Sequence, residues 1–452
     1  MTVKVRFAPS PTGYLHVGNC RTALINWLFA QQQKGTFLLR LDDTDQERSD
    51  KKYEKAIFED FNWLGITYDE IDRQSTRLHL YEDATSRLKK IGRLYPCYET
   101  PEELAFKRRQ QLGQGHPPIY DRAALSLTDM EKESFERKGR LPHWRFKLED
   151  QPIAWEDLVR GPVHFEGEKL SDPVLVRADG RPLYTLASVV DDIDFDITHI
   201  IRGEDHVANT AVQIQLMQAL GADPQKFHFA HLPLLAGESG EGLSKRQGSL
   251  SVRSLQQEGI LPLALIDLLG RLGTSLPIEA FSSNKPLIDG FSFSNFSRAT
   301  PKFTFEELRA LNTKLLHTLS YNEIRPYLTS WPQVTRSLWD NVQANLETLD
   351  DLGDWVRMYE VNPIPTCLPA DISLLQMALE TLPAQGWDDT DIWGFWLNAL
   401  KKRTPHKGRA LFMPLRQALT GQDHGPELSK IVRLLGYDKI KARLERALQQ
   451  IT

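Results

Sequence analysis

The fold of this chain is decided by the stretch Ala8-Pro9-Ser10-Pro11-Thr12-Gly13-Tyr14-Leu15-His16-Val17-Gly18-Asn19. Residues 3–7 before it alternate between apolar and polar side chains, which predicts a short strand. Residues 20–33 after it predict an amphipathic helix. A strand, a turn rich in Pro and Gly and a helix start together suit phosphate binding, because the first N–H groups of a helix are unpaired and partly positive.

Two residues of this turn are candidates for contact with a phosphate. His16 stands where its imidazole can donate a hydrogen bond to a phosphoryl oxygen, and Gly18 lets a bulky anion approach closely. The simpler alternative is that His16 only caps the helix. A second loop far downstream, Leu243-Ser244-Lys245-Arg246, follows a glycine-rich run and suits closure over a polyphosphate. The two loops in this order predict a nucleotide site.

Length and composition indicate an ordinary globular protein of several domains. The chain has 452 residues, of which 25% are charged and 41% hydrophobic, so we expect two to four domains. No apolar run approaches the roughly 20 residues that span a bilayer. The first residues lack the apolar core of a signal peptide, so we expect a cytoplasmic location without a membrane partner.

Cysteine usage and charge exclude several classes of protein. Cys20, Cys97 and Cys367 are scattered without any CxxC pattern, which argues against a disulfide framework and a structural zinc site. The net charge of −5 argues against indiscriminate coating of nucleic acid. A specific RNA held by local basic patches remains compatible, and residues 401–409 carry five Lys or Arg, although a solvated surface is the alternative there.

Alternating segments predict a parallel α/β sheet that is interrupted by an insertion. Residues 36–41 read as a buried strand, and residues 50–64 read as a helix that Gly65 stops. Thr44 and Glu47 have the spacing of a capping box before that helix. From 82 to 181 the pattern changes, and α/β alternation then resumes with a strand at 197–201, a helix at 208–220 and a strand at 228–235.

The remainder of the chain predicts helices between Pro or Gly breaks. The segments are 261–272, 305–311, 321–328, 337–354, 371–382, 392–401, 410–420 and 427–435. Neither a fixed-period repeat nor a coiled-coil heptad is present, so we expect one or two all-α domains and a monomer.

With both loops and the split sheet described, the chain resembles class I aminoacyl-tRNA synthetases, specifically the bacterial-type glutamyl-tRNA synthetase family, along nearly its whole length. Residues 6–19 look like that family's "HIGH" motif, and Leu243-Ser244-Lys245-Arg246 looks like its "KMSKS" loop. Residues 189–192 (Val-Val-Asp-Asp) and 201–206 (Ile-Arg-Gly-Glu-Asp-His) also match the family's pattern.

The resemblance implies a domain plan. It comprises a Rossmann-type catalytic domain at 1–81 and 182–235, split by an inserted acceptor-binding domain at 82–181. A stem-contact domain with the mobile loop would follow at 236–312, and a helical anticodon-binding region at 313–452. The implied fold class is therefore α/β followed by all-α.

The resemblance also implies an activity and its residues. Glutamate and ATP, with Mg²⁺ as counter-ion, would form glutamyl-adenylate, and the acyl group would then pass to tRNA. His16 and Lys245 would be the catalytic residues. The implied ATP-binding residues are Ser10, His16, Gly18, Asn19, Leu243, Ser244, Lys245 and Arg246. The implied glutamate-binding residues are Arg6, Ser10, Asp42, Tyr184 and Arg202, with Asp42 facing the α-amino group.

The chain departs from the family pattern at several positions. Many relatives have Glu where Asp42 stands, some have a pocket Asn where Ser188 stands, and Gly242 replaces the first lysine of the mobile loop. Of the cysteine cluster that binds zinc in some relatives, Cys97 alone remains, so we expect no zinc. Asn345 occupies the place of an arginine that discriminates the third anticodon position, which leaves tRNA-Gln open as an additional or preferred substrate beside tRNA-Glu.

Three alternatives to glutamate–tRNA ligation stay open at this point. A tRNA-independent nucleotidylyltransferase shares the phosphate loop, but it leaves the insertion and the helical C-terminal region unexplained. A short paralogue that glutamylates a base within tRNA resembles the catalytic half alone. A catalytically idle tRNA-binding paralogue is opposed by the intact His16, Lys245, Arg6 and Arg202.

Overall fold

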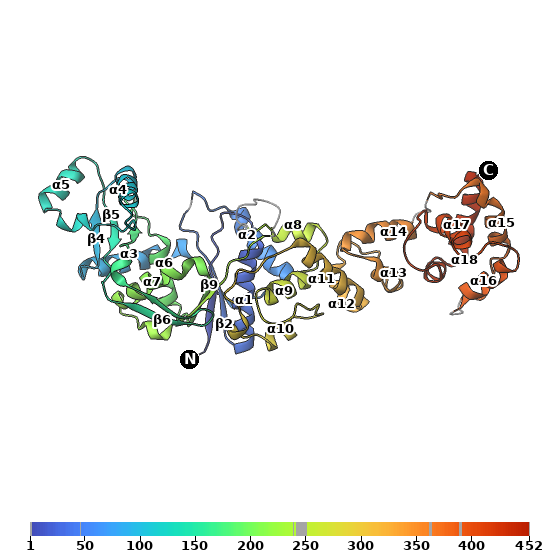
Figure 1. The fold of residues 1–452 in the computed structure, drawn as a ribbon, viewed down its shortest axis with the longest axis horizontal. Coiled ribbons are helices and arrows are strands. Elements are labelled where there is room, and N and C mark those ends of the chain that lie inside the picture. Colours follow the sequence, from blue (N-terminus) through green and yellow to red (C-terminus); the bar gives the residue numbers. More distant parts are fainter. Residues whose placement is uncertain are drawn as a thin grey trace. The chain divides into compact units, whose positions relative to one another are not determined.

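The structure is a computed structural model that describes residues 2–45, 47–237, 239–240, 251–360, 364–387 and 391–451 (Figure 1). Contacts within the chain divide it into two compact units. The first unit comprises the chain up to Leu255 with Ile266–Glu279 and Ser283–Thr304. The second comprises Gln256–Leu265, Ala280–Ser282 and the chain from Phe305 onward. The expected domain boundaries stay predictions.

Seven strands of the first unit form one sheet in the order β3-β2-β1-β9-β10-β6-β7. In that order the strands are Glu70–Arg73, Thr36–Leu41, Lys4–Phe7, His199–Gly203, His228–Leu232, Ile153–Asp157 and Gly161–Phe165. Every neighbouring pair is parallel except β6 and β7. Because β1 pairs with β9, segments far apart in the sequence lie side by side, and the predicted split parallel sheet is confirmed.

Helices of the first unit cover this sheet (Figure 1). They are α1 (Val17–Gln33), α2 (Lys51–Leu64), α3 (Leu78–Lys90), α6 (Tyr184–Asp194), α7 (Val207–Ala219) and α10 (Lys285–Asp289), while α8 (Val252–Gln257) and α9 (Pro262–Arg271) each include residues of both units. The prediction that α1 is amphipathic is wrong, because the helix is buried on most sides from Val17 to Ala30. Even Arg21 is buried, and it donates to the backbone carbonyls of Pro233 and Leu272.

The helix predicted at 50–64 is confirmed, but its cap differs from the prediction. The side chain of Asp50 accepts a hydrogen bond from the backbone N–H of Lys52, and Gly65 ends α2 in the left-handed conformation at φ 68°. Thr44 and Glu47 take no part in this cap, so the capping-box prediction for them is wrong. Residues 42–45, which follow β2, therefore do not cap the start of α2.

The segment predicted as an insertion contributes to two sheets. β4 (Leu94–Cys97), β5 (His143–Phe146) and β8 (Val174–Val176) form a separate three-stranded sheet, accompanied by α4 (Pro101–Gly113) and α5 (Asp129–Arg137). β6 and β7 instead extend the seven-stranded sheet, because β6 pairs with β10. The segment 82–181 thus contributes two strands at one edge of the seven-stranded sheet and forms the three-stranded sheet by itself.

The second unit is helical from Phe305 onward, as predicted. Its helices are α11 (Phe305–Thr318), α12 (Tyr321–Ile324), α13 (Arg336–Val342), α14 (Leu352–Glu360), α15 (Ile372–Glu380), α16 (Ile392–Lys401), α17 (Arg409–Thr420) and α18 (Leu428–Ile451). The single helix expected at 337–354 is wrong, because the carboxylate of Asp351 accepts from the backbone N–H groups of Glu347 and Thr348 and starts a new helical turn there. α18 also runs well beyond its predicted end, across a kink at Gly436.

Candidate active site

A pocket of about 810 Å³ lies at the carboxyl ends of β1, β9 and β10, where doubly wound sheets bind their ligands. Every predicted site residue that the structure describes in the first unit lines this pocket: Arg6, Ser10, His16, Gly18, Asn19, Asp42, Tyr184 and Arg202. The predicted loop residues Leu243, Ser244, Lys245 and Arg246 lie outside the described residues. Asn345 is an exposed residue of the second unit.

His16 is the N-cap of α1, so the capping interpretation is confirmed. Its Nδ1 accepts hydrogen bonds from the backbone N–H groups of Gly18 at 3.1 Å and Asn19 at 3.3 Å. Burial lowers the pKa of His16, which keeps the ring neutral at pH 7. A neutral ring that accepts at Nδ1 carries its proton on Nε2. Capping uses Nδ1 and therefore leaves Nε2–H free to donate. The predicted contact with a phosphate would use Nε2.

Arg6, on β1, is held by a carboxylate behind the pocket. Its Nε and Nη2 donate to the two carboxylate oxygens of Asp192 at 3.0 and 3.3 Å, and both side chains are buried. Burial opposes the ionisation of Asp192, but the charges of Arg6 and Arg40 outweigh it and lower the pKa of that carboxyl. The bidentate pair fixes the plane of the Arg6 guanidinium.

Asp42, the residue that follows the neighbouring strand β2, is paired within the protein. Arg40 donates to its two oxygens at 2.8 and 3.2 Å, while a further nitrogen of Arg40 reaches Asp192 at 3.0 Å. Burial raises the pKa of Asp42 to about 6 against the charge of Arg40, so the carboxyl is ionised at pH 7. A substrate ammonium at Asp42 would share this carboxylate with Arg40.

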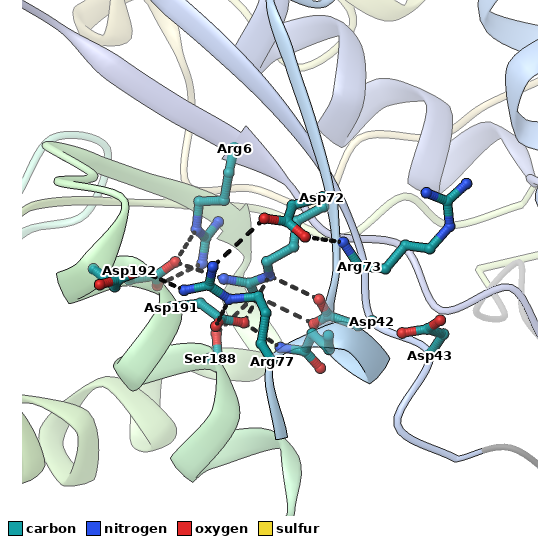
Figure 2. A network of polar contacts seen from close by, with 12 residues as sticks. Arg6, Asp42, Asp43, Asp72, Arg73, Arg77, Ser188, Asp191 and Asp192 are labelled. Atoms are coloured by element: carbon teal, nitrogen blue, oxygen red, sulfur yellow. Dashed lines mark hydrogen bonds and ion pairs between the residues drawn. The ribbon is translucent and has the colours of Figure 1, made fainter. Parts of the chain in front are cut away.

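A buried network joins these pairs, as Figure 2 shows. Asp191, Asp192 and Ser188 come from α6, and they face Arg6 on β1 and Asp42 just after β2. Ser188 accepts from Arg40 at 3.2 Å, so this departure from the family serves the network behind the pocket. Asp191 accepts from groups farther from the pocket: Gln74, Arg77 and Tyr81. Burying charged groups is costly unless ion pairs or hydrogen bonds compensate the lost water, and this network supplies both.

Arg202, on β9, has a different environment from Arg6. Its guanidinium donates to neutral acceptors: the hydroxyl of Tyr184 at 3.1 Å, the hydroxyl of Thr210 at 2.6 Å, the amide oxygen of Gln213 at 2.5 Å and Nε2 of His231 at 3.4 Å. Within the described part of the chain, no carboxylate forms an ion pair with it. It is 5% exposed, so its positive charge is buried without a direct carboxylate partner. Burial lowers the pKa of Arg202, and the more distant charge of Asp192 only partly opposes that shift. Such a group attracts an anionic ligand.

Several residues that contact the predicted site residues were not themselves predicted from the sequence. Arg40 interrupts the apolar run of β2, and a lone arginine inside a buried strand was a usable signal. Thr210, Gln213 and His231 gave no such signal, because their contacts with Arg202 come only from the fold.

Comparison with known proteins agrees with this geometry. Residues 2–310 match the family model described as "tRNA synthetases class I (E and Q), catalytic domain", and residues 318–448 match "Anticodon binding domain". The chain belongs to the glutamyl-tRNA synthetase family of class I enzymes. A relative from Azospirillum brasilense named "Glutamate--tRNA ligase" is 52% identical and covers 98% of this chain and 99% of its own. "Glutamate--tRNA ligase 1" of Maricaulis maris is 50% identical with 98% of each chain covered.

Solved structures place the synthetase in the same fold. A glutamate tRNA ligase from Elizabethkingia meningosepticum, solved in complex with its amino acid, matches with a TM-score of 0.85 at 27% identity over 100% of both chains. The glutamate-tRNA synthetase of Elizabethkingia anophelis gives 0.82 at 28% identity, over 99% of this chain and 100% of the other. The predicted family and the predicted fold class are therefore confirmed, as is the expectation of an enzyme.

Three possible metal ligands of the synthetase converge near β4 and β5. Donor atoms of Cys97, Glu99 and His143 lie within 4.8 Å of one another. Burial raises the pKa of the Cys97 thiol to about 12, which opposes a thiolate, and Glu99 already accepts from the hydroxyl of Tyr120 at 2.7 Å. Structural zinc takes four donors, whereas the described residues bring these three together. The expected absence of zinc stays a prediction.

Over the ranges that the structure describes, no helix combines the length and apolar character needed to cross a bilayer.

Proposed function

We propose that the chain attaches L-glutamate to tRNA, with ATP as co-substrate and glutamyl-adenylate as the intermediate. The observation that carries this proposal is the convergence of Arg6, Arg202 and Asp42 in one pocket beside the start of α1. Two guanidinium groups and one carboxylate complement the two carboxylates and one ammonium of glutamate. Relatives about half identical over nearly the whole chain are named glutamate–tRNA ligases.

The proposed reaction has two group transfers. An oxygen of the α-carboxylate attacks the α-phosphorus of ATP, and the bond to the β-phosphate oxygen breaks to release pyrophosphate. A terminal ribose hydroxyl of tRNA then attacks the carbonyl carbon and loses its proton, and AMP departs. The protein's part is to align the reacting atoms and to stabilise the spreading phosphoryl charge.

His16 is the residue that we assign to the phosphates within the described chain. Its Nε2–H is the available donor, and the pocket also contains the first turn of α1 with Gly18 and Asn19. Lys245 would neutralise the departing pyrophosphate. Among the described lining residues the carboxylates are Asp42 and Asp205, so Mg²⁺ would be held mainly by the phosphates of ATP and would supply positive charge there.

Aminoacylation with labelled glutamate tests the proposal directly. The full-length chain should charge purified tRNA in the presence of ATP and release one AMP for each glutamate transferred. Transfer of the nucleotidyl group of ATP to an acceptor other than tRNA, without any charging of tRNA, would instead favour a nucleotidylyltransferase. Failure to charge either tRNA-Glu or tRNA-Gln by a folded protein would refute the proposal and favour an idle tRNA-binding paralogue.

We also infer that tRNA-Gln is accepted beside tRNA-Glu. Asn345 is exposed in a short turn after α13, and its amide donates to the carbonyl of Val342 at 3.4 Å. An asparagine is shorter than arginine and uncharged, so it offers no bidentate, charge-assisted contact with which to reject a base. This inference rests on the alignment of Asn345 with the family's discriminating arginine.

Parallel charging of both tRNAs, with two variants, tests this inference. Asn345→Arg should suppress charging of tRNA-Gln by at least about tenfold while tRNA-Glu is retained, because a good bidentate contact is worth ~1–3 kcal/mol of discrimination. Asn341→Arg adds the same charge to the neighbouring helix α13 and should leave the ratio unchanged. Charging of tRNA-Glu alone by the wild-type chain would refute the inference.

A further inference from the structure

A buried carboxylate and imidazole lie behind Arg202, outside the set of residues that line the pocket. Asp157 ends β6, His231 lies on β10, and Arg202 lies directly opposite His231 on β9. Asp157 is 2% exposed and His231 is completely buried. Neither residue has a part in the reaction described above, and burying both groups is costly unless hydrogen bonds or ion pairs compensate them.

Asp157 determines which nitrogen of His231 carries the proton. Its Oδ2 lies 2.5 Å from Nδ1 of His231, and its Oδ1 accepts from the backbone N–H groups of Val159, Arg160 and His231. Burial opposes ionisation of Asp157, but these hydrogen bonds prevail and lower its pKa. An ionised Asp157 only accepts, so Nδ1 of His231 must be protonated.

The other nitrogen of His231 is therefore an acceptor that faces Arg202. Burial lowers the pKa of His231, which keeps the ring neutral and leaves Nε2 unprotonated. Nε2 lies 3.4 Å from Nε of Arg202 and 2.9 Å from the hydroxyl of Thr210, which itself accepts from Arg202. The carboxylate thus acts on Arg202 through an imidazole and never pairs with it.

We propose that Asp157 and His231 are positioning residues, which orient Arg202 through a neutral acceptor and leave its charge for a carboxylate of the amino-acid substrate. This inference rests on the proposed glutamate-binding role of the pocket. A direct carboxylate would hold Arg202 equally well, but it would compete with the substrate for the guanidinium. Arg6 shows that alternative in the same pocket, because Asp192 occupies two of its nitrogens.

Asp157→Asn tests the proposal, because it keeps the shape and reverses the proton arrangement. The Asn amide would donate to Nδ1, the proton of His231 would move to Nε2, and an N–H would then face the N–H of Arg202. Losing a hydrogen bond to a charged group should raise KM for glutamate about 10- to 100-fold, with KM for ATP unchanged within about twofold. Nitrogen-15 NMR of His231 should show the proton on Nδ1 in the wild type and on Nε2 in the variant.

A second variant and a control separate positioning from folding. Adding His231→Gln to Asp157→Asn returns an oxygen acceptor to Arg202 without needing Asp157, and it should recover part of the lost glutamate affinity. Asp172→Asn removes another buried carboxylate, which accepts from the backbone N–H of Leu148 away from the pocket. This control should lower thermal stability while KM for glutamate stays at the wild-type value.

Two results would overturn the proposal. One is an unchanged KM for glutamate in a folded Asp157→Asn protein. The other is an equal loss for glutamate and ATP that follows the fall in thermal stability, as in a merely structural role. If the wild-type chain fails to bind or transfer glutamate, the proposed function fails instead, and the NMR measurement still reports the tautomer of His231 independently.

Discussion

Gly18→Ala is the substitution for which the structure gives the sharpest expectation. A Cβ at Gly18 would lie 2.9 Å from Cε1 and 3.0 Å from Nδ1 of His16, closer than real Cβ contacts allow. The imidazole would have to leave the cap and lose its hydrogen bonds to the backbone N–H groups of Gly18 and Asn19. The glycine therefore makes room for His16. The close approach of an anion at Gly18 stays a prediction.

Stability and activity should respond differently to this change. Loss of an N-cap interaction costs about 1 kcal/mol, and replacing a helical Gly by Ala returns about 1 kcal/mol, so the net change in unfolding free energy should be near zero. Activity should fall roughly 10²–10³-fold, the usual cost of losing one donor to a charged transition state, because Nε2–H no longer points to its position in the pocket. Aminoacylation kinetics and thermal unfolding of the same preparation measure both quantities.

Two further variants decide the cause of the loss. Gly113→Ala places a methyl group in open space at the end of α4, so it should leave activity unchanged and raise the unfolding free energy by at most about 1 kcal/mol. His16→Ala should be about as inactive as Gly18→Ala, and the double variant should be no worse than His16→Ala alone. Full activity in Gly18→Ala would refute the reasoning, and additive losses in the double variant would show that Gly18 acts directly on ATP.

Three other expectations follow from the site. The kcat/KM for glutamate should fall as pH drops below about 6, because Asp42, whose pKa is raised to about 6, becomes neutral; a flat profile from pH 7 to 5 would contradict this. Arg6→Lys keeps the charge but loses the bidentate pair with Asp192. KM for glutamate should therefore rise about tenfold, and the free energy of unfolding measured in urea should fall by ~1–3 kcal/mol. Unchanged values of both quantities would contradict this expectation. Elemental analysis should find far less than one zinc per chain, and a full equivalent bound near Cys97 would refute the expectation.

Local signals account for the elements that the sequence predicted well. The cap by Asp50 and the stop at Gly65 act within one helical turn of α2, and the apolar run at 36–41 matches β2 in both bounds. The break in the helix at 343–351 was not predicted. It depends on hydrogen bonds from the backbone N–H groups of Glu347 and Thr348 to the side chain of Asp351, and no sequence pattern marks which backbone groups a carboxylate will contact. The burial of α1 was missed because its covering comes from residues more than 200 positions away, such as Leu272.

The candidate site also has one part that the sequence predicts and another part that it does not. Its lining could be predicted because the motif at 6–19 carries most of it in one stretch, and the parallel sheet brings Arg202 beside that stretch. Several contacts behind the lining could not, because they join positions that are far apart in the sequence. Arg40 reaches Asp192, and His231 reaches Asp157, from different strands or helices. A single sequence offers no periodicity or spacing that pairs such positions.

The network behind the pocket gives the two arginines that we propose to bind the substrate, Arg6 and Arg202, different environments. Arg6 is paired with Asp192, and Asp42 is paired with Arg40, so these groups present fixed geometry with little net charge. Arg202 donates to neutral acceptors, and no carboxylate of the described chain pairs with it directly. Glutamate brings one more negative charge than glutamine, and an unpaired buried charge costs ~3–5 kcal/mol. If the pocket binds glutamate as we propose, selection of an acidic amino acid would depend on the lack of a direct carboxylate partner at Arg202 as much as on the groups that line the pocket.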